Sequence, residues 1–392
     1  MEHTRRFFPI LGKGLAYLDN AASSLTPEPV LDEMLSYYRT YRANVHRGFS
    51  RLSRIASERY DRAHEEVASF IGAKSDELVF VPNATYGINM VALALELHRG
   101  DKVVTSDVEH HSNLLPWLRL KRQGVAVEAV EASSSGLLSA DSFEDVIDER
   151  TRIVSLAHVS NAVGAVQPVE EIGRIARNAG CLFLVDAAQS APHRRMDVKK
   201  IGCDILVFSG HKMLGPTGIG GLYLRREVRK KLAPPIIGGG SATEVNLDGY
   251  TLSGGSASWE AGTPNIAGAI GLARAVEFLS KLGMRKVEAH GRRLAKAAAK
   301  GMQSLPGLTV YGPRVPQGSI VSFNIEGISP DDVALMLDER DIMVRSGFHC
   351  AVPYVKKMSA EGVVRASFYL YNTKEEVERL LAVIEAVGRE LS

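Results

Sequence analysis

The sequence contains few cysteines and no concentration of charge of either sign. Only 3 cysteines occur among 392 residues, Cys181, Cys203 and Cys350, and none of them lies in a C-x-x-C pair. This excludes a disulfide framework and a cysteine-ligated structural zinc, and it favours a reducing compartment. The 47 basic and 45 acidic side chains nearly cancel, so we expect neither nucleic acid nor an anionic membrane as a main partner.

Long hydrophobic runs are also missing. The apolar stretch near the N-terminus is too short and too interrupted for a signal peptide or a membrane span. We therefore expect a cytoplasmic protein. With 45% hydrophobic and 23% charged residues the composition is that of a globular protein, and 392 residues suggest two domains.

The sequence does contain an alternation of short apolar runs with amphipathic segments. Runs rich in Val, Ile and Leu occur at 101–109, 152–160, 181–188, 204–210 and 218–226. Such runs are typical of strands that are buried on both faces of a mostly parallel sheet. Amphipathic segments such as 170–180 separate them, and this alternation predicts a layered α/β domain over residues 15–280.

The pattern changes near residue 280. Two long charged helices are predicted at 284–305 and 373–392, with a few strands between them. We expect residues 281–392, together with 1–14, to form a smaller α+β domain. The Gly-rich segment 236–262 is predicted to be a long loop, and loops of that length are often functional.

Polar residues follow several predicted strands, at the edge where open α/β sheets bind ligands. They are Asp186 and Gln189 after one strand, Ser209, His211 and Lys212 after the next, and Asn161, His110, Ala84 and Thr85 elsewhere.

Each of these residues also has an ordinary structural interpretation. An aspartate such as Asp186 often caps the following helix, and Lys212 is compatible with a surface turn. The pair His110 and His111 is compatible with solvated side chains. A metal site is not expected, because no further ligands at matched spacing accompany the pair.

Pyridoxal 5′-phosphate is one cofactor that requires this set of groups together. It needs a lysine amine for a Schiff base and a carboxylate at its pyridine nitrogen, which Lys212 and Asp186 supply. Its phosphate favours a helix N-terminus with hydroxyl and imidazole donors. Thr85, Ser209 and His211 are candidates for those donors.

The sequence resembles the class V aminotransferase group of fold-type I pyridoxal-phosphate enzymes, and within it the SufS-type cysteine desulfurases, which are related to selenocysteine lyases. The motifs FSGHKMLGPTG at 208–218 and RSGFHCA at 345–351 carry this resemblance, which covers about residues 15–375. It implies a large domain with a mostly parallel, seven-stranded mixed sheet flanked by helices. It also implies a smaller α+β C-terminal domain that carries the Cys350 loop.

The resemblance assigns cofactor roles to residues in the matching motifs. Lys212 would form the Schiff base, Asp186 would pair with the pyridine nitrogen and Gln189 with the phenolic oxygen. His110 would stack on the ring and shuttle protons as a catalytic residue. The residues expected at the phosphate are Ala84, Thr85, Ser209, His211 and, completing the site of the other subunit in a homodimer, Thr263.

The resemblance also implies the reaction. The Cys350 thiolate would attack the sulfur of bound L-cysteine, which gives L-alanine and a persulfide on Cys350. That sulfur would pass to an acceptor or scaffold protein for iron–sulfur cluster or other sulfur-cofactor assembly. A cationic neighbourhood would favour the thiolate. The residues expected to bind substrate or line its entrance are Arg365, Asn161, Arg345, His46 and Arg47.

The sequence departs from the family pattern near the phosphate and near the thiol. Ala84 stands where a second hydroxyl residue is usual, Tyr86 stands where an acid is common, and Phe348 stands where some relatives have histidine. We expect these changes to alter substrate access or partner contacts. The compact loop around Cys350 predicts weak intrinsic turnover that a docked acceptor stimulates.

Three alternatives remain open at this point. The protein could be a selenocysteine lyase, or another class V enzyme such as an aminotransferase or an epimerase. It could also be a non-catalytic scaffold that binds a sulfur carrier.

Overall fold

A seven-stranded sheet forms the centre of the computed structural model, which describes residues 1–46 and 48–390. The strand order is β2-β8-β7-β6-β5-β3-β4. Strands β7, β6, β5, β3 and β4 are parallel, whereas β8 runs antiparallel to both of its neighbours. The expected mostly parallel, mixed sheet is therefore confirmed. Its strands are β2 (Leu78–Val81), β3 (Lys102–Ser106), β4 (Ala126–Val130), β5 (Thr151–Ala157), β6 (Leu182–Asp186), β7 (Ile205–Ser209) and β8 (Gly220–Leu224).

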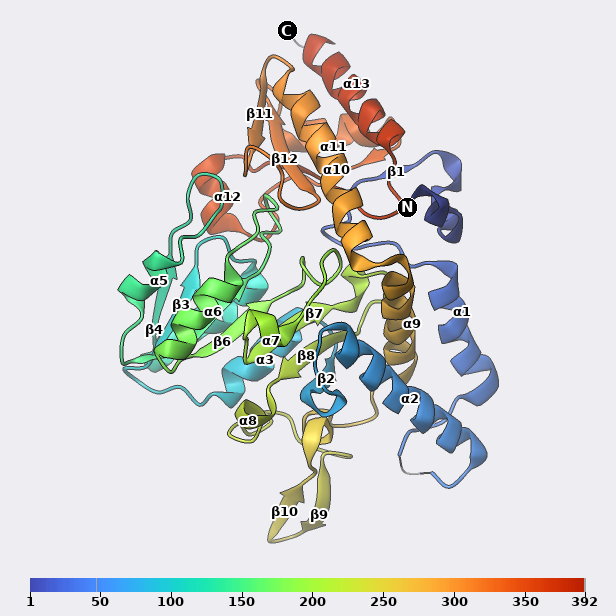
Figure 1. Ribbon diagram of the computed structural model, residues 1–392, viewed down its shortest axis with the longest axis vertical. Coiled ribbons are helices and arrows are strands. Elements are labelled where there is room, and N and C mark those ends of the chain that lie inside the picture. The colour runs from blue at the N-terminus through green and yellow to red at the C-terminus, as the bar shows by residue number, and fades with distance from the viewer. Residues whose placement is uncertain (47, 391–392) are drawn as a thin grey trace.

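Helices cover both faces of this sheet (Figure 1). Successive strand residues point to opposite faces. Phe183 and Val185 of β6 therefore pack into one core cluster, and Leu184 packs into the other. The helices of the large layer are α1 (Glu28–Ser36), α2 (Arg51–Phe70), α3 (Ala84–Ala94), α4 (Leu115–Leu120), α5 (Asp141–Val146), α6 (Val169–Asn178), α7 (Val198–Ile201), α8 (Arg226–Arg229) and α9 (Ile266–Leu282).

A second, smaller layer packs beyond one end of the large sheet (Figure 1, top). Three antiparallel strands form its sheet, in the order β11-β12-β14, and helices α10 and α13 pack beside them around a third core cluster. The helices are α10 (Met284–Gln303), α11 (Pro330–Asp338), α12 (Val352–Met358) and α13 (Lys374–Glu390), and the strands are β11 (Leu308–Tyr311), β12 (Ile320–Ile325) and β14 (Val364–Ser367).

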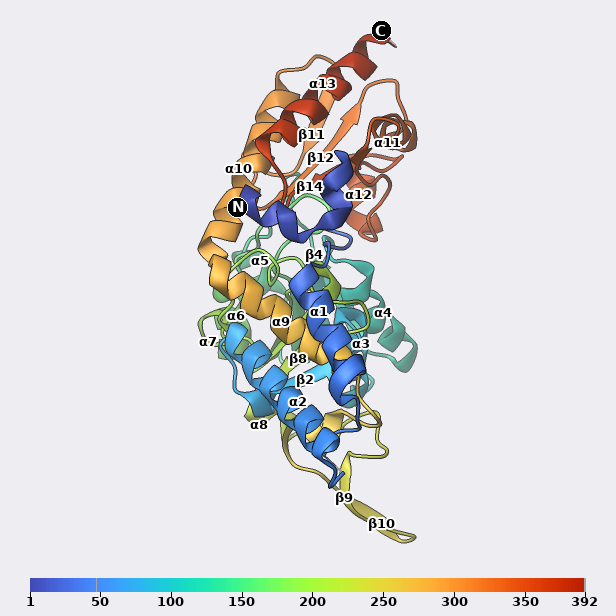
Figure 2. The same cartoon turned by 90° about the vertical axis from the view of Figure 1, so that its right-hand side faces the viewer.

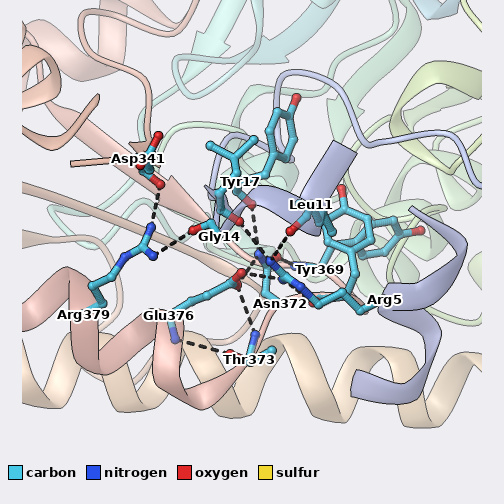
Figure 3. Close-up of polar contacts among 12 residues, drawn as sticks. Arg5, Leu11, Gly14, Tyr17, Asp341, Tyr369, Asn372, Thr373, Glu376 and Arg379 are labelled. Carbon is cyan, nitrogen blue, oxygen red and sulfur yellow. Dashed lines mark hydrogen bonds and ion pairs between the residues drawn. The ribbon is translucent and has the colours of Figure 1, made fainter. Parts of the chain in front are cut away.

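Residues 1–17 pack against this smaller layer (Figures 2 and 3). Strand β1 (Ala16–Tyr17) pairs in parallel with β13 (Ile342–Met343). The guanidinium of Arg5 forms a 2.5 Å ion pair with Glu376 of α13, and it donates to the carbonyl oxygen of Leu15. Arg379 of α13 donates to the carbonyl oxygens of Gly14 and Asp341. The short helices of this segment are η1 (Glu2–Phe7) and η2 (Pro9–Lys13).

The segment predicted as a long loop at 236–262 contains regular structure, so that prediction is wrong in part. Strands β9 (Ala242–Asn246) and β10 (Gly249–Leu252) form an antiparallel hairpin that projects from the large layer (Figure 1, bottom). The side-chain oxygen of Asn246 accepts from the N–H groups of Asp248 and Gly249, which closes the turn. The turn chemistry of Asn-Leu-Asp-Gly thus outweighs the high glycine content of the segment.

Within residues 1–46 and 48–390, no helix has the length and apolar character that crossing a membrane requires.

Candidate active site

A cavity of about 390 Å³ lies at the carboxyl ends of strands β5, β6 and β7. Loops from the smaller layer close its other side. Most of the residues predicted from the sequence meet in this cavity. They are Lys212, Asp186, Gln189, His110, Thr85, Ala84, Ser209, His211, Asn161, Arg345, Arg365 and Cys350.

Lys212 follows β7 in the short helix η7 (Gly210–Lys212) and faces the cavity. Burial lowers the pKa of its amine to about 8, although the charge of Asp186 acts in the opposite direction. The neutral amine is therefore far more populated near neutral pH than it is for an ordinary lysine. A neutral lysine amine can act as a nucleophile or accept a proton.

Asp186 ends β6 and is 5% exposed. Burial raises the pKa of its carboxyl, whereas the N–H of Ala188 and the charge of Lys212 act to lower it. One carboxylate oxygen accepts from the N–H of Ala188 at 2.9 Å, and no other described residue forms a hydrogen bond with this side chain, which lines the cavity. Gln189 beside it donates to the carbonyl oxygen of Ala21 at 2.7 Å.

His110 is held as a neutral imidazole. Burial and the nearby charge of Lys212 lower its pKa to about 3. Its Nδ1 accepts from the N–H of Ser112 at 3.0 Å, which places the ring proton on Nε2. The loop that carries His110 is fixed by the buried Glu109, whose carboxyl group accepts from Asn113 at 2.6 Å and from the N–H of Ala157 at 2.8 Å. Burial raises the pKa of this carboxyl to about 8.

The N-terminus of α3 lies at another side of the cavity. The Oγ of Ser209 accepts from the N–H of Ala84 at 3.0 Å, so the backbone of this alanine holds the Ser209 hydroxyl at the start of the helix. The hydroxyls of Thr85 and Ser112 lie 2.6 Å apart. Burial lowers the pKa of His211 to about 4, so its ring is neutral near neutral pH. Together these groups form a polar pocket at a helix N-terminus, where anions bind readily.

Two arginines share one carboxylate at the side opposite the sheet. Arg345 donates to both oxygens of Asp19, with its shortest contact at 2.8 Å, and Arg365 donates to Asp19 at 3.2 Å. Arg365 is 2% exposed and also donates to the backbone oxygen of Asn161 at 2.9 Å. Among the described residues its buried Nε has no hydrogen-bond partner. Two cations and one anion leave this corner with an excess positive charge.

Cys350 lies in the loop between β13 and α12, and it is exposed, whereas Cys181 and Cys203 are buried. Two donors from the large layer hold this loop. The side-chain amide of Asn161 donates to the carbonyl oxygen of His349 at 2.6 Å, and the backbone N–H of His111 donates to the carbonyl oxygen of Cys350 at 2.7 Å.

Two residues predicted from the sequence are not among those that line this cavity. His46 and Thr263 line a second cavity of about 310 Å³, together with Tyr60 and Glu260. Glu260 fixes the loop before Thr263, because its carboxylate accepts from the hydroxyl of Tyr60 and the N–H of Phe80, both at 2.6 Å. Arg47, which was also predicted from the sequence, lies outside the described residues.

Sequence reasoning missed several residues that build the cavity. Asp19 and Glu109 received no role, although each is a buried acid in or beside a motif that matched the family. Acids placed within apolar surroundings are a usable signal, because a buried carboxylate requires partners. Ser112 and the backbone of Ala21 left no comparable signal in the sequence.

Comparisons with known proteins place the chain in a known family. The model of the "Aminotransferase class-V" family matches residues 16–380. A probable cysteine desulfurase from Pyrococcus abyssi is 46% identical, over 100% of this chain and 98% of that protein. A second one, from Methanothermobacter thermautotrophicus, is 44% identical over 99% of this chain and 98% of that protein.

Solved structures agree as well. The apo cysteine desulfurase of Thermococcus onnurineus superposes with a TM-score of 0.96 at 46% identity, covering 100% of this chain and 98% of that one. The cysteine desulfurase CsdA of Escherichia coli gives a TM-score of 0.93 at 34% identity, covering 99% and 98%. These neighbours confirm the expected fold. The chain belongs to the class V aminotransferase family.

Proposed function

We propose that the cavity around Lys212 is the active site of a cysteine desulfurase that forms a persulfide on Cys350. The chain is a cysteine desulfurase, and pyridoxal 5′-phosphate is its cofactor. One observation carries the assignment to this cavity. A buried amine, a buried carboxylate and the one exposed thiol of the chain line the same cavity of about 390 Å³.

The residues present fit pyridoxal phosphate. The amine of Lys212 would hold the aldehyde carbon, and the free oxygen of Asp186 would accept from the protonated pyridine nitrogen. Gln189 lines the cavity, and the second N–H of its side-chain amide would suit the phenolic oxygen. The neutral ring of His110 suits stacking. The polar pocket at the N-terminus of α3, with Thr85, Ala84, Ser209 and His211, suits the phosphate.

The bound cofactor supplies an electron sink that makes the substrate's Cβ–S bond labile. Lys212 then serves as the base that takes the α-proton, since burial keeps its pKa near 8. The neutral ring of His110 lines the cavity and bears its proton on Nε2, so it can donate that proton. The Cys350 thiolate attacks the substrate sulfur, so an S–S bond forms while the Cβ–S bond breaks. The two electrons of the broken Cβ–S bond stay with the carbon, which is protonated to give alanine.

Substrate binding rests on the arginine corner. A substrate carboxylate would balance the excess positive charge left by Arg345, Arg365 and Asp19. Arg365 provides a buried, unpartnered Nε among the described residues, and guanidinium groups bind carboxylates strongly. Asn161 lies beside it, and its backbone oxygen accepts from Arg365. One N–H of its side-chain amide is donated to His349, and the other would be a further donor to the carboxylate.

The active unit is a homodimer in which Thr263 completes the phosphate site of the other subunit and His46 lines the entrance. Their place in a separate cavity, away from Lys212 of the same chain, supports this arrangement. A mixing experiment tests it. Lys212→Ala and Thr263→Ala chains, each inactive alone, should regain about a quarter to a half of the activity when co-assembled, because one site per mixed dimer is intact. No recovery would exclude a shared site.

The proposed subtype of the enzyme and the proposed destination of its sulfur go beyond family membership. The compact, pinned Cys350 loop supports a SufS-type enzyme that hands its sulfur to an acceptor or scaffold protein for iron–sulfur cluster or other sulfur-cofactor assembly. The enzyme acts in the cytoplasm.

The contacts of Arg5 and Arg379 support a smaller domain made of residues 1–14 and 281–392, with residues 15–280 as the large domain.

A selenocysteine lyase is the second candidate, because the same cavity would serve it. Selenium leaves carbon more readily than sulfur does, so its release needs no enzyme thiol. We expect Cys350→Ala to abolish alanine formation from L-cysteine and to spare alanine formation from L-selenocysteine. Equal survival of both activities would remove Cys350 from the reaction.

A further inference from the structure

The side chain of Asn161 joins two regions that are far apart in the sequence. Asn161 lies in the turn after β5, and His349 lies in the loop after β13. The Nδ2 of Asn161 donates to the carbonyl oxygen of His349 at 2.6 Å, and both residues are buried. A hydrogen bond at this distance in a buried setting is well formed.

The loop that receives this bond has an unusual backbone. His349 and Cys350 adopt φ angles of 50° and 55°, so two consecutive residues with a Cβ lie in the left-handed region. Residues other than glycine disfavour this region, and such conformations persist only where the surroundings enforce them. The carbonyl oxygens of both residues accept from the large layer, one from Asn161 and the other from the backbone N–H of His111 at 2.7 Å.

Asn161 also contacts the residue proposed to bind the substrate carboxylate. Its backbone oxygen accepts from the guanidinium of Arg365 at 2.9 Å. One residue therefore fixes the substrate-binding arginine through its backbone and the thiol-bearing loop through its side chain. Asn161 therefore links the position of the substrate-binding arginine to the position of the thiol-bearing loop.

We propose that Asn161 is a positioning residue for Cys350, which it holds for attack on the substrate sulfur. The inference rests on the proposed function, and it adds a role that carboxylate binding alone does not include. Without the amide of Asn161, the left-handed pair would relax and carry the thiol away from the substrate. Misplacement of a reacting group by about 1 Å costs roughly 10²-fold in rate.

The two roles of Asn161 make different predictions for two substrates. A residue that only binds the carboxylate affects L-cysteine and L-selenocysteine alike, because both carry the same carboxylate. A residue that positions Cys350 affects L-cysteine selectively, since selenium release needs no thiol. The ratio of the two turnover rates therefore isolates the positioning role.

The experiment measures alanine release from both amino acids by the holoenzyme. It compares the wild type with Asn161→Ala, the isosteric Asn161→Asp, Arg365→Lys and Cys350→Ala. We expect both Asn161 variants to lose about 10²-fold more kcat on L-cysteine than on L-selenocysteine. Arg365→Lys should raise KM for both substrates by a similar factor. The Cys350→Ala result tests the proposed function separately, because it does not involve Asn161.

Hydrogen exchange on the cofactor-free proteins supplies a second readout. The amides of residues 349–351 should exchange faster in both Asn161 variants, and the amides of β12 should exchange at the wild-type rate. Equal losses on both substrates, or unchanged exchange in the loop, would overturn the inference. Equal alanine release from L-cysteine by the wild type and by Cys350→Ala would instead overturn the proposed function.

Discussion

The guanidinium of Arg365 lies 3.2 Å from the carboxylate of Asp19, and both side chains are buried. Burial lowers the pKa of Arg365 to about 10, and the charge of Asp19 opposes that shift. Asp19 thus stabilises the charged form of Arg365, which is buried away from water.

Replacing Asp19 by alanine should lower the free energy of unfolding by about 3–5 kcal/mol, because a buried charge loses its partner. Urea denaturation monitored by far-UV circular dichroism measures this. As a matched control, Asp61→Ala removes a carboxylate that is 60% exposed and 3.6 Å from His46, and it should cost less than about 1 kcal/mol. Similar losses in the two variants would contradict the role of Asp19.

The uptake of pyridoxal phosphate by the cofactor-free protein should depend on the protonation of Lys212. Only the neutral amine attacks the aldehyde, and burial lowers the pKa of this amine to about 8. The rate of uptake should therefore rise with pH and level off above about pH 8. The growth of visible absorbance after mixing measures it. A rate that still increases as for an ordinary lysine, toward about pH 10, would show that Lys212 is not in the buried state described.

Removal of the buried Glu109 side chain should loosen the loop that carries His110. Its carboxyl group accepts from Asn113 and from the N–H of Ala157, and each buried donor left without a partner costs about 1–3 kcal/mol. Glu109→Ala should therefore lower the melting temperature. It should also slow α-proton exchange of L-alanine, followed by NMR in D₂O. An unchanged exchange rate in a folded Glu109→Ala variant would show that Glu109 does not act through His110.

Because Asn161 and His111 hold the Cys350 loop, turnover should be limited when nothing removes the persulfide from Cys350. Without an added thiol, L-cysteine should give a burst of about one alanine per subunit and then nearly stop, because the single nucleophile is used up. Added dithiothreitol should restore steady turnover. Rapid-quench measurement of alanine follows both phases. Linear alanine release at full rate without any thiol would contradict the proposed limit.

Much of the site was predictable because a parallel sheet brings strand ends together. Asp186, Lys212 and Asn161 follow different strands, and all three line one cavity at the same edge. The smaller layer was predictable only in outline, from its change of helical pattern. The antiparallel pairing of Arg345 with Arg365, which brings both arginines to Asp19, depends on contacts between distant segments.

Other features of the site left no local signal. The separation of Thr263 from Lys212 follows from the path of the chain after the β9–β10 hairpin, and that hairpin was predicted as a loop. The left-handed backbone at His349 and Cys350 is imposed by Asn161 and His111 from outside the loop. Residue types alone do not reveal a conformation that their own preferences oppose.

The persulfide itself provides the most direct test. The holoenzyme is mixed with one equivalent of L-cysteine without added thiol, digested, and examined by mass spectrometry. We predict one added sulfur atom on the peptide that contains Cys350 and none on the peptides that contain Cys181 or Cys203, which are buried. Formation of alanine from L-cysteine with no sulfur on Cys350, at a rate that Cys350→Ala leaves unchanged, would contradict the account.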